Sequence, residues 1–235
     1  MNIQPYIDLD QQLLLSVNGS DSLFWDGFMW TATSTATWIP LACVLLYVIF
    51  KNKSVKESLL LLVMLALVIT FADQIASGIC KPYFARFRPA QDPELMYMVD
   101  VVNGYRGGRY GFISSHAANT MGVALFLACV FRHKWLSAGL FSWWALNCYT
   151  RMYLGVHYPG DIFFGTIDGI VCGLLIYGLH QFLHRKFFKE SRFVSNQYTS
   201  SGYLKTDVNL ILMAMLLTLV FIVVWGMYTT YRLHL

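Results

Sequence analysis

The residues best suited to chemistry in this chain fall into three short segments. They are Lys81 with Arg88-Pro89, then Ser114-Ser115-His116, then Arg151 with His157 and Asp161. Together these segments offer ammonium and guanidinium groups, imidazoles, hydroxyls and a carboxylate. Charged groups are costly in an apolar environment and are usually functional where they occur there. We therefore interpret the three segments as parts of one site.

The first segment suits an anion. An ammonium group beside a forked guanidinium matches the oxygens of a tetrahedral phosphate. We predict that the apolar helix before this segment ends at Lys81, because Pro82 disfavours helical geometry in the preceding residue. Lys81 and Arg88 converge if the residues between them fold back. The alternative is an interfacial cluster whose side chains extend to lipid phosphates.

The second segment precedes an apolar run and has the features of a helix start. Ser114 or Ser115 is expected to be the N-cap, so that free N–H groups and the helix dipole face an anion. His116 then lies in the first turn. An imidazolium there can protonate a departing alkoxide near neutral pH, although a capping or interfacial histidine fits the same position.

The third segment pairs an imidazole with a carboxylate four residues later. Asp161 can accept one ring N–H of His157 and leave the other ring nitrogen free to attack. We predict that Pro159-Gly160 forms a turn and that Asp161 caps or opens the next helix. A purely structural His157–Asp161 pair at a helix entry is the other interpretation.

The elements that hold these residues follow from composition. Of 235 residues 57% are hydrophobic and 13% are charged, whereas soluble domains average about 45–50% and about 25%. Six apolar runs indicate a polytopic all-α membrane protein, because they are continuous and lack the alternation of barrel strands. The runs cover residues 25–50, 58–80, 116–131, 135–153, 162–182 and 208–228. We expect one domain, residues 1–235, with its motif core at 81–161.

Basic residues predict the orientation of these helices. Residues 51–56, 132–134 and 185–205 carry ten of the 17 Lys and Arg residues and form alternate connections between the six runs. The positive-inside rule places them in the cytoplasm. Both termini and the loops holding the three segments then face outward, which in a bacterial inner membrane is the periplasm.

Several classes of protein find no support in the sequence. It contains no Walker loop, no GxGxxG and no HExxH, and the five cysteines lie in or beside apolar runs without CxxC spacing. We expect no metal, no cofactor and no disulfide framework. The net charge of +4 lies largely in the cytoplasmic loops and the site. This distribution favours the lipid bilayer and its anionic headgroups as partners over nucleic acid.

The three segments together resemble the signature of the type 2 phosphatidic acid phosphatase (PAP2) superfamily: K-x6-RP, PSGH and SR-x5-H-x3-D. The resemblance implies that His157 is a nucleophile that forms a phosphohistidine, that Asp161 orients it and that His116 is the acid. It also implies that no metal is needed. The implied phosphate-binding residues are Lys81, Arg88, Ser114, Ser115 and Arg151.

The chain departs from this signature at three positions. Ile113 and Ser115 replace the Pro and Gly of PSGH, and Thr150 replaces the Ser before Arg151. Ser115 adds a Cβ atom where the family has none, so the local turn is expected to differ. Thr150 keeps its hydroxyl, and none of the three changes removes a group with an implied catalytic role.

A site at the outer surface of a membrane suits a lipid with a phosphate headgroup. The resemblance implies a lipid phosphatase whose substrate is a polyprenyl diphosphate, lipid A, phosphatidylglycerophosphate or phosphatidate, and we favour undecaprenyl diphosphate or lipid A. The alternatives are a phosphotransferase that passes the group to a second lipid and a non-enzymatic transporter. Four charged residues have no assigned role at this point: Asp73, Asp168, Arg106 and Arg109.

Overall fold

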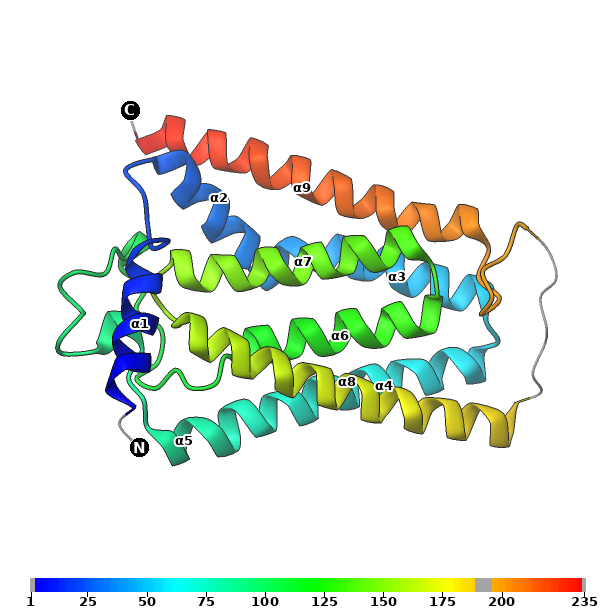
Figure 1. The fold of residues 1–235 in the computed structure, drawn as a ribbon. Helices are drawn as coiled ribbons and strands as arrows, with labels where there is room; N and C mark the ends of the chain where they lie inside the picture. Colours follow the sequence, from blue (N-terminus) through cyan, green and yellow to red (C-terminus); the bar gives the residue numbers. More distant parts are fainter. Residues whose placement is uncertain (1–2, 189–195, 234–235) are drawn as a thin grey trace.

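The computed structural model describes residues 3–188 and 196–233, which form a bundle of helices (Figure 1). Within these ranges β-type pairing is confined to two isolated bridges, so the predicted all-α class is confirmed. The α-helices are α1 (Gln4–Leu15), α2 (Leu23–Thr33), α3 (Ile39–Asn52), α4 (Val55–Asp73), α5 (Lys81–Phe84), α6 (Ser115–Phe131), α7 (Lys134–Tyr153), α8 (Pro159–Phe187) and α9 (Lys205–Leu233).

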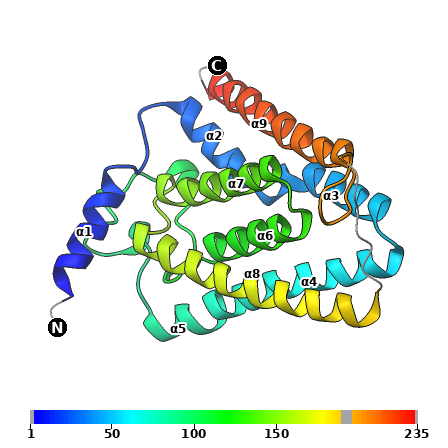
Figure 2. The same cartoon turned by 45° about the vertical axis from the view of Figure 1, so that its right-hand side comes forward.

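Four segments of the described chain are long and apolar enough to cross a membrane: Thr35–Asn52, Val55–Phe84, Pro159–Phe187 and Lys205–Thr229. The helix α6 is apolar but has only 17 residues, and α7 is less apolar. Figures 1 and 2 show both of these helices running alongside the long ones. The chain is thus an integral membrane protein with four candidate spans, and the predicted total of six stays a prediction.

The first predicted run, residues 25–50, is divided between two helices. Ser34 is extended, with φ −71° and ψ 125°, and a short 3-10 turn, η1 (Thr35–Trp38), precedes α3. Thr37 Oγ1 donates to the Thr31 carbonyl at 2.7 Å, and Trp38 Nε1 donates to the Ala32 carbonyl at 2.8 Å. Side-chain donors therefore satisfy the carbonyls that have no backbone partner at the end of α2. This is how the helix can end within an apolar run.

The predicted helix end at Lys81 is wrong, because helical structure continues to Phe84. A π-helical segment, η2 (Gln74–Cys80), joins α4 to α5 immediately before Pro82. A π segment changes the local hydrogen-bond register, and local adjustments of this kind accommodate a proline that lacks an N–H group. The helix ends at Ala85, whose φ of 45° is left-handed. Lys81 therefore lies on the last turn of a long helix.

The close approach of α6 and α8 positions the site. Three glycines at four-residue spacing, Gly165, Gly169 and Gly173, line the face of α8 that meets α6. A Cβ atom at Gly165 would collide with the carbonyl of Ser114, and one at Gly169 with that of Ala118. Small residues at this spacing let two helix backbones pack directly. The N-terminal ends of α6 and α8 consequently lie beside each other.

The two ends of the bundle differ in content. The helix α1 lies across one end, which also holds the loop at residues 85–114 and the connection between α7 and α8 (Figure 1). The connections from α3 to α4 and from α6 to α7 lie at the opposite end, as do the C-terminal end of α8 and the N-terminal end of α9. Basic residues of these segments predict the cytoplasmic side, and Lys189 and Arg192 of the predicted connection 185–205 lie outside the described residues.

Candidate active site

The three segments meet at the end of the bundle that carries α1. Lys81 lies on the last helical turn before the loop at residues 85–114, and Ser114 begins α6. Arg151 lies in the last turn of α7, and Asp161 lies in the first turn of α8. The charges of Lys81, Arg88 and Arg151 all act on the His157 imidazole. The convergence assumed from the sequence is therefore present in the fold.

The connection between α7 and α8 holds His157 beside Asp161. Gly155 makes the turn with a left-handed φ of 65°, which glycine adopts without steric cost. His157 Nδ1 lies 3.3 Å from Asp161 Oδ2, and the two side chains are 1% and 0% exposed. The same Oδ2 accepts from the backbone N–H of Tyr158 at 3.1 Å. The carboxylate thus faces one ring nitrogen of His157, and the backbone of Gly111 also hydrogen-bonds the ring.

The helix α8 begins at Pro159, the first residue of the predicted turn. Pro159 and Gly160 are its first two residues, so the predicted Pro159-Gly160 turn is wrong. Proline suits a first helical position because its fixed φ is helical and its missing N–H would have no partner there. Asp161 is the third residue of α8 and caps its start, because its Oδ2 accepts from the Tyr158 N–H. Its backbone carbonyl accepts from the Ser114 N–H at 3.0 Å. This bond joins the start of α6 to the start of α8.

Burial and three cations keep the His157 imidazole neutral. Burial, followed by the charges of Arg88, Arg151 and Lys81, holds the pKa of His157 well below its usual range. Burial and the Arg151 charge also lower the pKa of Arg88. Positive charges near an imidazole make its protonated, cationic form less favourable. His157 therefore retains a lone pair at neutral pH, which a nucleophile requires.

The three cations are held mainly by neutral partners, which leaves their charge available to an anion. Arg151 is 3% exposed, and its Nη1 donates to Thr33 Oγ1 at 2.8 Å. The Arg151 Nε is buried and has no partner among the described residues. Arg88 Nε donates to the Tyr110 carbonyl at 3.2 Å. An unpaired buried donor beside other cations favours an anionic ligand.

Lys81 ends a chain of polar contacts along η2. Its Nζ donates to Ser77 Oγ at 2.9 Å and to Ser115 Oγ at 3.0 Å. Ser77 Oγ in turn donates to Asp73 Oδ1 at 3.2 Å. Asp73 therefore supports Lys81 through a serine. The Cβ atom of Ser115, foreign to the family pattern, carries a hydroxyl that contacts the lysine.

The start of α6 matches the expected helix start. Ser114 is the N-cap, and its Oγ accepts from the Ala117 N–H at 3.4 Å. His116 lies in the first turn, and the charges of Arg151, Arg88 and Lys81 act on it, as does His157. The eight predicted site residues are thus gathered around one place. Their individual roles remain those that the resemblance implies.

Asp168, Arg106 and Arg109, to which the sequence assigned no role, each contact another group of the protein. Asp168 is buried on α8, where its Oδ1 accepts from Cys172 Sγ at 3.5 Å. Arg106 Nη1 donates to the Ala90 carbonyl at 2.6 Å, and the Arg109 guanidinium lies over the Phe87 ring at 5.2 Å. Among residues 3–188 and 196–233, no group of three or more His, Cys, Asp and Glu side chains is placed to hold a metal ion.

Sequence reasoning missed two residues that contact the center. Arg86 Nη1 donates to Asp161 Oδ1 at 3.1 Å, and Arg86 Nη2 donates to Asp10 Oδ2 at 2.7 Å. The only signal for Arg86 is its position inside the Lys81–Arg88 segment. Nothing local in the sequence indicates Asp10, which lies on α1, a helix that the six predicted runs do not include.

Comparisons with known proteins agree with this geometry. The profile of the PAP2 superfamily matches residues 57–185. A lipid A 4'-phosphatase of Bacteroides thetaiotaomicron is 47% identical over 172 residues, which cover 72% of this chain and 76% of that protein. A lipid A 4'-phosphatase of Porphyromonas gingivalis is 35% identical over 185 residues, which cover 79% of this chain and 78% of that protein. No solved structure matches the chain.

The matched range contains all three segments and most or all of each helix that holds them. The apolar spans agree with a lipid phosphatase that works in a membrane. The chain belongs to the PAP2 superfamily and is a membrane lipid phosphatase, a hydrolase of phosphoric esters.

Proposed function

We propose that this phosphatase removes the 4'-phosphate of lipid A through a phosphohistidine on His157. The buried His157–Asp161 pair, with three cations acting on it, carries the mechanistic part of the proposal. The choice of lipid A over undecaprenyl diphosphate is supported by the printed activity of both relatives. Each relative is similar over more than two thirds of its own length.

In the first step the free ring nitrogen of His157 attacks phosphorus. The P–N bond forms as the bond from phosphorus to the sugar oxygen breaks, and His116 gives its proton to the departing oxygen. Asp161 holds the His157 ring through Nδ1 and stabilises the positive charge that develops on it. A bound phosphate offsets the cations beside His116 and so favours the imidazolium that this step needs.

In the second step water attacks the phosphohistidine. His116, now neutral, takes a proton from the water while the P–N bond breaks, which releases inorganic phosphate and restores neutral His157. Lys81, Arg88 and Arg151 offset the charge on the phosphoryl oxygens in both steps. Most phosphoryl-transfer catalysis arises from such positioning and charge stabilisation. Loss of one of these cations is expected to cost about 10²–10³ in rate.

We infer that the site faces the periplasm. Two of the basic connections, from α3 to α4 and from α6 to α7, lie at the end of the bundle opposite to the three segments (Figure 1). Basic connections are retained in the cytoplasm. The site then opens at the level of outer-leaflet headgroups, where a lipid phosphate is accessible.

Phosphate release by the detergent-purified protein tests this function. Lipid A, undecaprenyl diphosphate and phosphatidate are supplied in EDTA, and mass spectrometry identifies which phosphate of lipid A is lost. We expect release of the 4'-phosphate by the wild type and none by His157→Ala. The control is His184→Ala, because His184 pairs with Glu57 near the C-terminal end of α8.

Other outcomes separate the alternatives. Release from undecaprenyl diphosphate alone would replace the substrate and keep the mechanism. Release that survives His157→Ala would overturn the phosphohistidine. Loss of lipid phosphate that requires a second lipid, without inorganic phosphate, would indicate the phosphotransferase.

A further inference from the structure

The Asp161 carboxylate is held on both of its oxygens. Oδ2 faces His157 and accepts from the Tyr158 N–H, while Oδ1 accepts from Arg86 Nη1 at 3.1 Å. Asp161 is fully buried, and the Arg86 side chain is 27% exposed. A carboxylate held at both oxygens has little freedom to rotate. The direction in which it presents Oδ2 to the imidazole is therefore set in part by Arg86.

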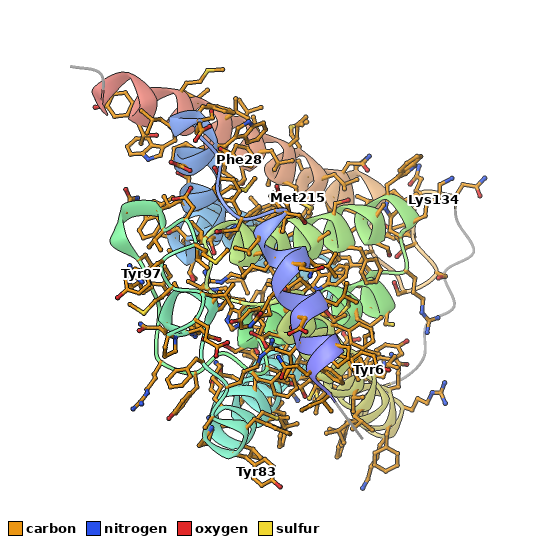
Figure 3. All side chains as sticks on the ribbon, turned by 60° about the vertical axis from the view of Figure 1, so that its left-hand side comes forward. Tyr6, Phe28, Tyr83, Tyr97, Lys134 and Met215 are labelled. Atoms are coloured by element: carbon orange, nitrogen blue, oxygen red, sulfur yellow. The ribbon has the colours of Figure 1, made fainter. Side chains whose placement is uncertain are left out.

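The Arg86 guanidinium is itself fixed from two sides. Its Nη2 donates to Asp10 Oδ2 at 2.7 Å, and its Cζ lies over the Tyr158 ring, 4.0 Å from the ring center. Asp10 is 14% exposed and lies on α1, which Figure 3 shows crossing the end of the bundle, with Tyr6 labelled on it. Arginine suits this position because its planar fork can bind two carboxylates and stack on an aromatic ring.

Asp10 also contacts the start of α8 directly. Its Oδ1 accepts from the Gly160 N–H at 2.7 Å, one of the free donors of the first helical turn. A Cβ atom at residue 160 would lie 2.8 Å from Asp10 Oδ2, so a side chain there would displace the Asp10 carboxylate. Leu14, one turn further along α1, is fully buried in a cluster with Leu95, Val99 and Tyr158. The helix α1 is thus packed against the His157 loop.

We propose that Asp10 and Arg86 are positioning residues for the phosphatase reaction, acting in series through Asp161 on the His157 imidazole. The N-terminal helix is then part of the catalytic apparatus, although it lies outside all three sequence segments. This inference rests on the proposed role of His157 as the nucleophile. It assigns Arg86 a function different from that of the three phosphate-binding cations, because its guanidinium is bound to carboxylates.

The kinetic consequence follows from this arrangement. Loss of Arg86 leaves Asp161 Oδ1 buried without its cation, and the carboxylate can turn away from His157. Removing an outer partner that orients a ligating or reacting group typically costs about 10–100-fold in activity. Because Arg86 is not expected to touch substrate, kcat should fall while KM stays nearly constant.

Steady-state kinetics of full-length protein in detergent test the inference, with Arg86→Ala, Arg86→Lys, Asp10→Asn and Asp8→Asn as variants. We expect kcat to fall about 10–100-fold in Arg86→Ala, with partial recovery in Arg86→Lys, which keeps one cationic donor. Asp10→Asn should lower kcat less, because its amide oxygen can still accept from Gly160. Asp8 is the matched control, since it lies on the same helix and pairs only with Gln4 among the described contacts.

A double variant tests action in series. Asp10→Asn combined with Arg86→Ala should be no slower than Arg86→Ala alone, because coupled residues are not additive. A kcat within twofold of wild type in Arg86→Ala would overturn the inference. So would a raised KM at unchanged kcat, which would make Arg86 a substrate-binding cation.

Hydrogen exchange separates this inference from the proposed function. Arg86→Ala should increase exchange in α1 and in the first turn of α8, whether or not a lipid substrate is turned over. If the wild type released no phosphate but exchange rose in both segments, the proposed function would fail and the contact between α1 and Asp161 would stand without a catalytic role. Unchanged exchange in both segments would refute the positioning itself.

Discussion

At the scale of single residues, the site depends on one buried imidazole with a fixed orientation. Asp161 faces His157 Nδ1, and burial together with the charges of Arg88, Arg151 and Lys81 keeps the pKa of His157 low. A histidine with an ordinary pKa near 6.5 would be partly protonated near neutral pH and would lose nucleophilicity. Burial and neighbouring positive charge therefore keep the proposed nucleophile neutral before any substrate is bound.

Substitution of Gly111 tests how much displacement of His157 and Asp161 the activity tolerates. A Cβ atom at residue 111 would lie 3.0 Å from Asp161 Oδ2, 3.1 Å from Arg88 Cγ and 3.5 Å from His157 Nδ1. We expect Gly111→Ala to lower kcat about 10–100-fold, because small displacements of a reacting group are costly. Steady-state phosphate release, together with a thermal melt that reports folding, measures this effect.

Gly108→Ala is the matched control for this change. Gly108 lies in the same loop, has open space around its Cβ position and has no left-handed φ. Its activity should stay within about twofold of wild type, as expected for a surface substitution away from special features. Equal activities of the two alanine variants would show that the His157–Asp161 pair tolerates displacement.

At the scale of elements, the packing of α6 against α8 brings two helix N-termini together. Gly165, Gly169 and Gly173 allow this contact. At the starts of the two helices, the Ser114 N–H donates to the Asp161 carbonyl. The two starts carry His116 and Asp161, which belong to different motifs. The separation of the proposed acid, His116, from the carboxylate that faces His157 is thus set by how closely these two helices approach.

Gly169→Ala is expected to force α6 and α8 apart. Its Cβ would collide with the Ala118 carbonyl and would lie 2.8 Å from Met121 Cβ. We expect destabilisation of about 1–3 kcal/mol, as for other overpacked interiors. Unfolding in mixed detergent measures it, and activity should fall as the helix starts move apart.

Gly178 on the same helix provides the control. Nothing lies within 4 Å of its Cβ position. Gly178→Ala should be neutral or slightly stabilising, since alanine is the better helix former. If both alanine variants were equally stable, the glycine face of α8 would not be what sets the helix separation.

At the scale of the whole molecule, the two ends of the bundle have different chemistry. The site, α1 and the loop at residues 85–114 occupy one end, and the basic connections from α3 to α4 and from α6 to α7 occupy the other. Nonpolar side chains are exposed along the four candidate spans between them, as expected for surfaces that face lipid. Such a molecule can present its site at only one face of the membrane.

Cysteine labelling tests which face that is. In intact cells, a maleimide that passes the outer membrane but cannot cross the inner membrane should label Gly108→Cys, in the loop beside the site. It should label Lys134→Cys, in a basic connection, only after the inner membrane is permeabilised. The parent protein gives the background from its own five cysteines. The reverse pattern would place the site in the cytoplasm.

Much of the site could be read from the sequence because its signals are local. His157 and Asp161 are four residues apart, Ser114 directly precedes an apolar helix, and Lys81 and Arg88 lie in one short segment. Spacings of this length fix which side chains can meet, through the geometry of a turn or a helix start. The apolar runs likewise determined an all-α membrane protein, because a chain in lipid must satisfy its backbone within helices.

Only the tertiary structure decided the contacts between distant segments. Asp10 meets Gly160 across 150 positions of sequence, and Arg86 meets Asp161 across 75. Such contacts depend on how whole helices pack, and helix packing is set by shape along entire faces. The break at Ser34 and the helix that continues past Pro82 were missed for a related reason. At Ser34, side-chain donors satisfy backbone carbonyls of the broken helix. Before Pro82, a π segment accommodates the proline, so the helix continues where local propensity predicts its end.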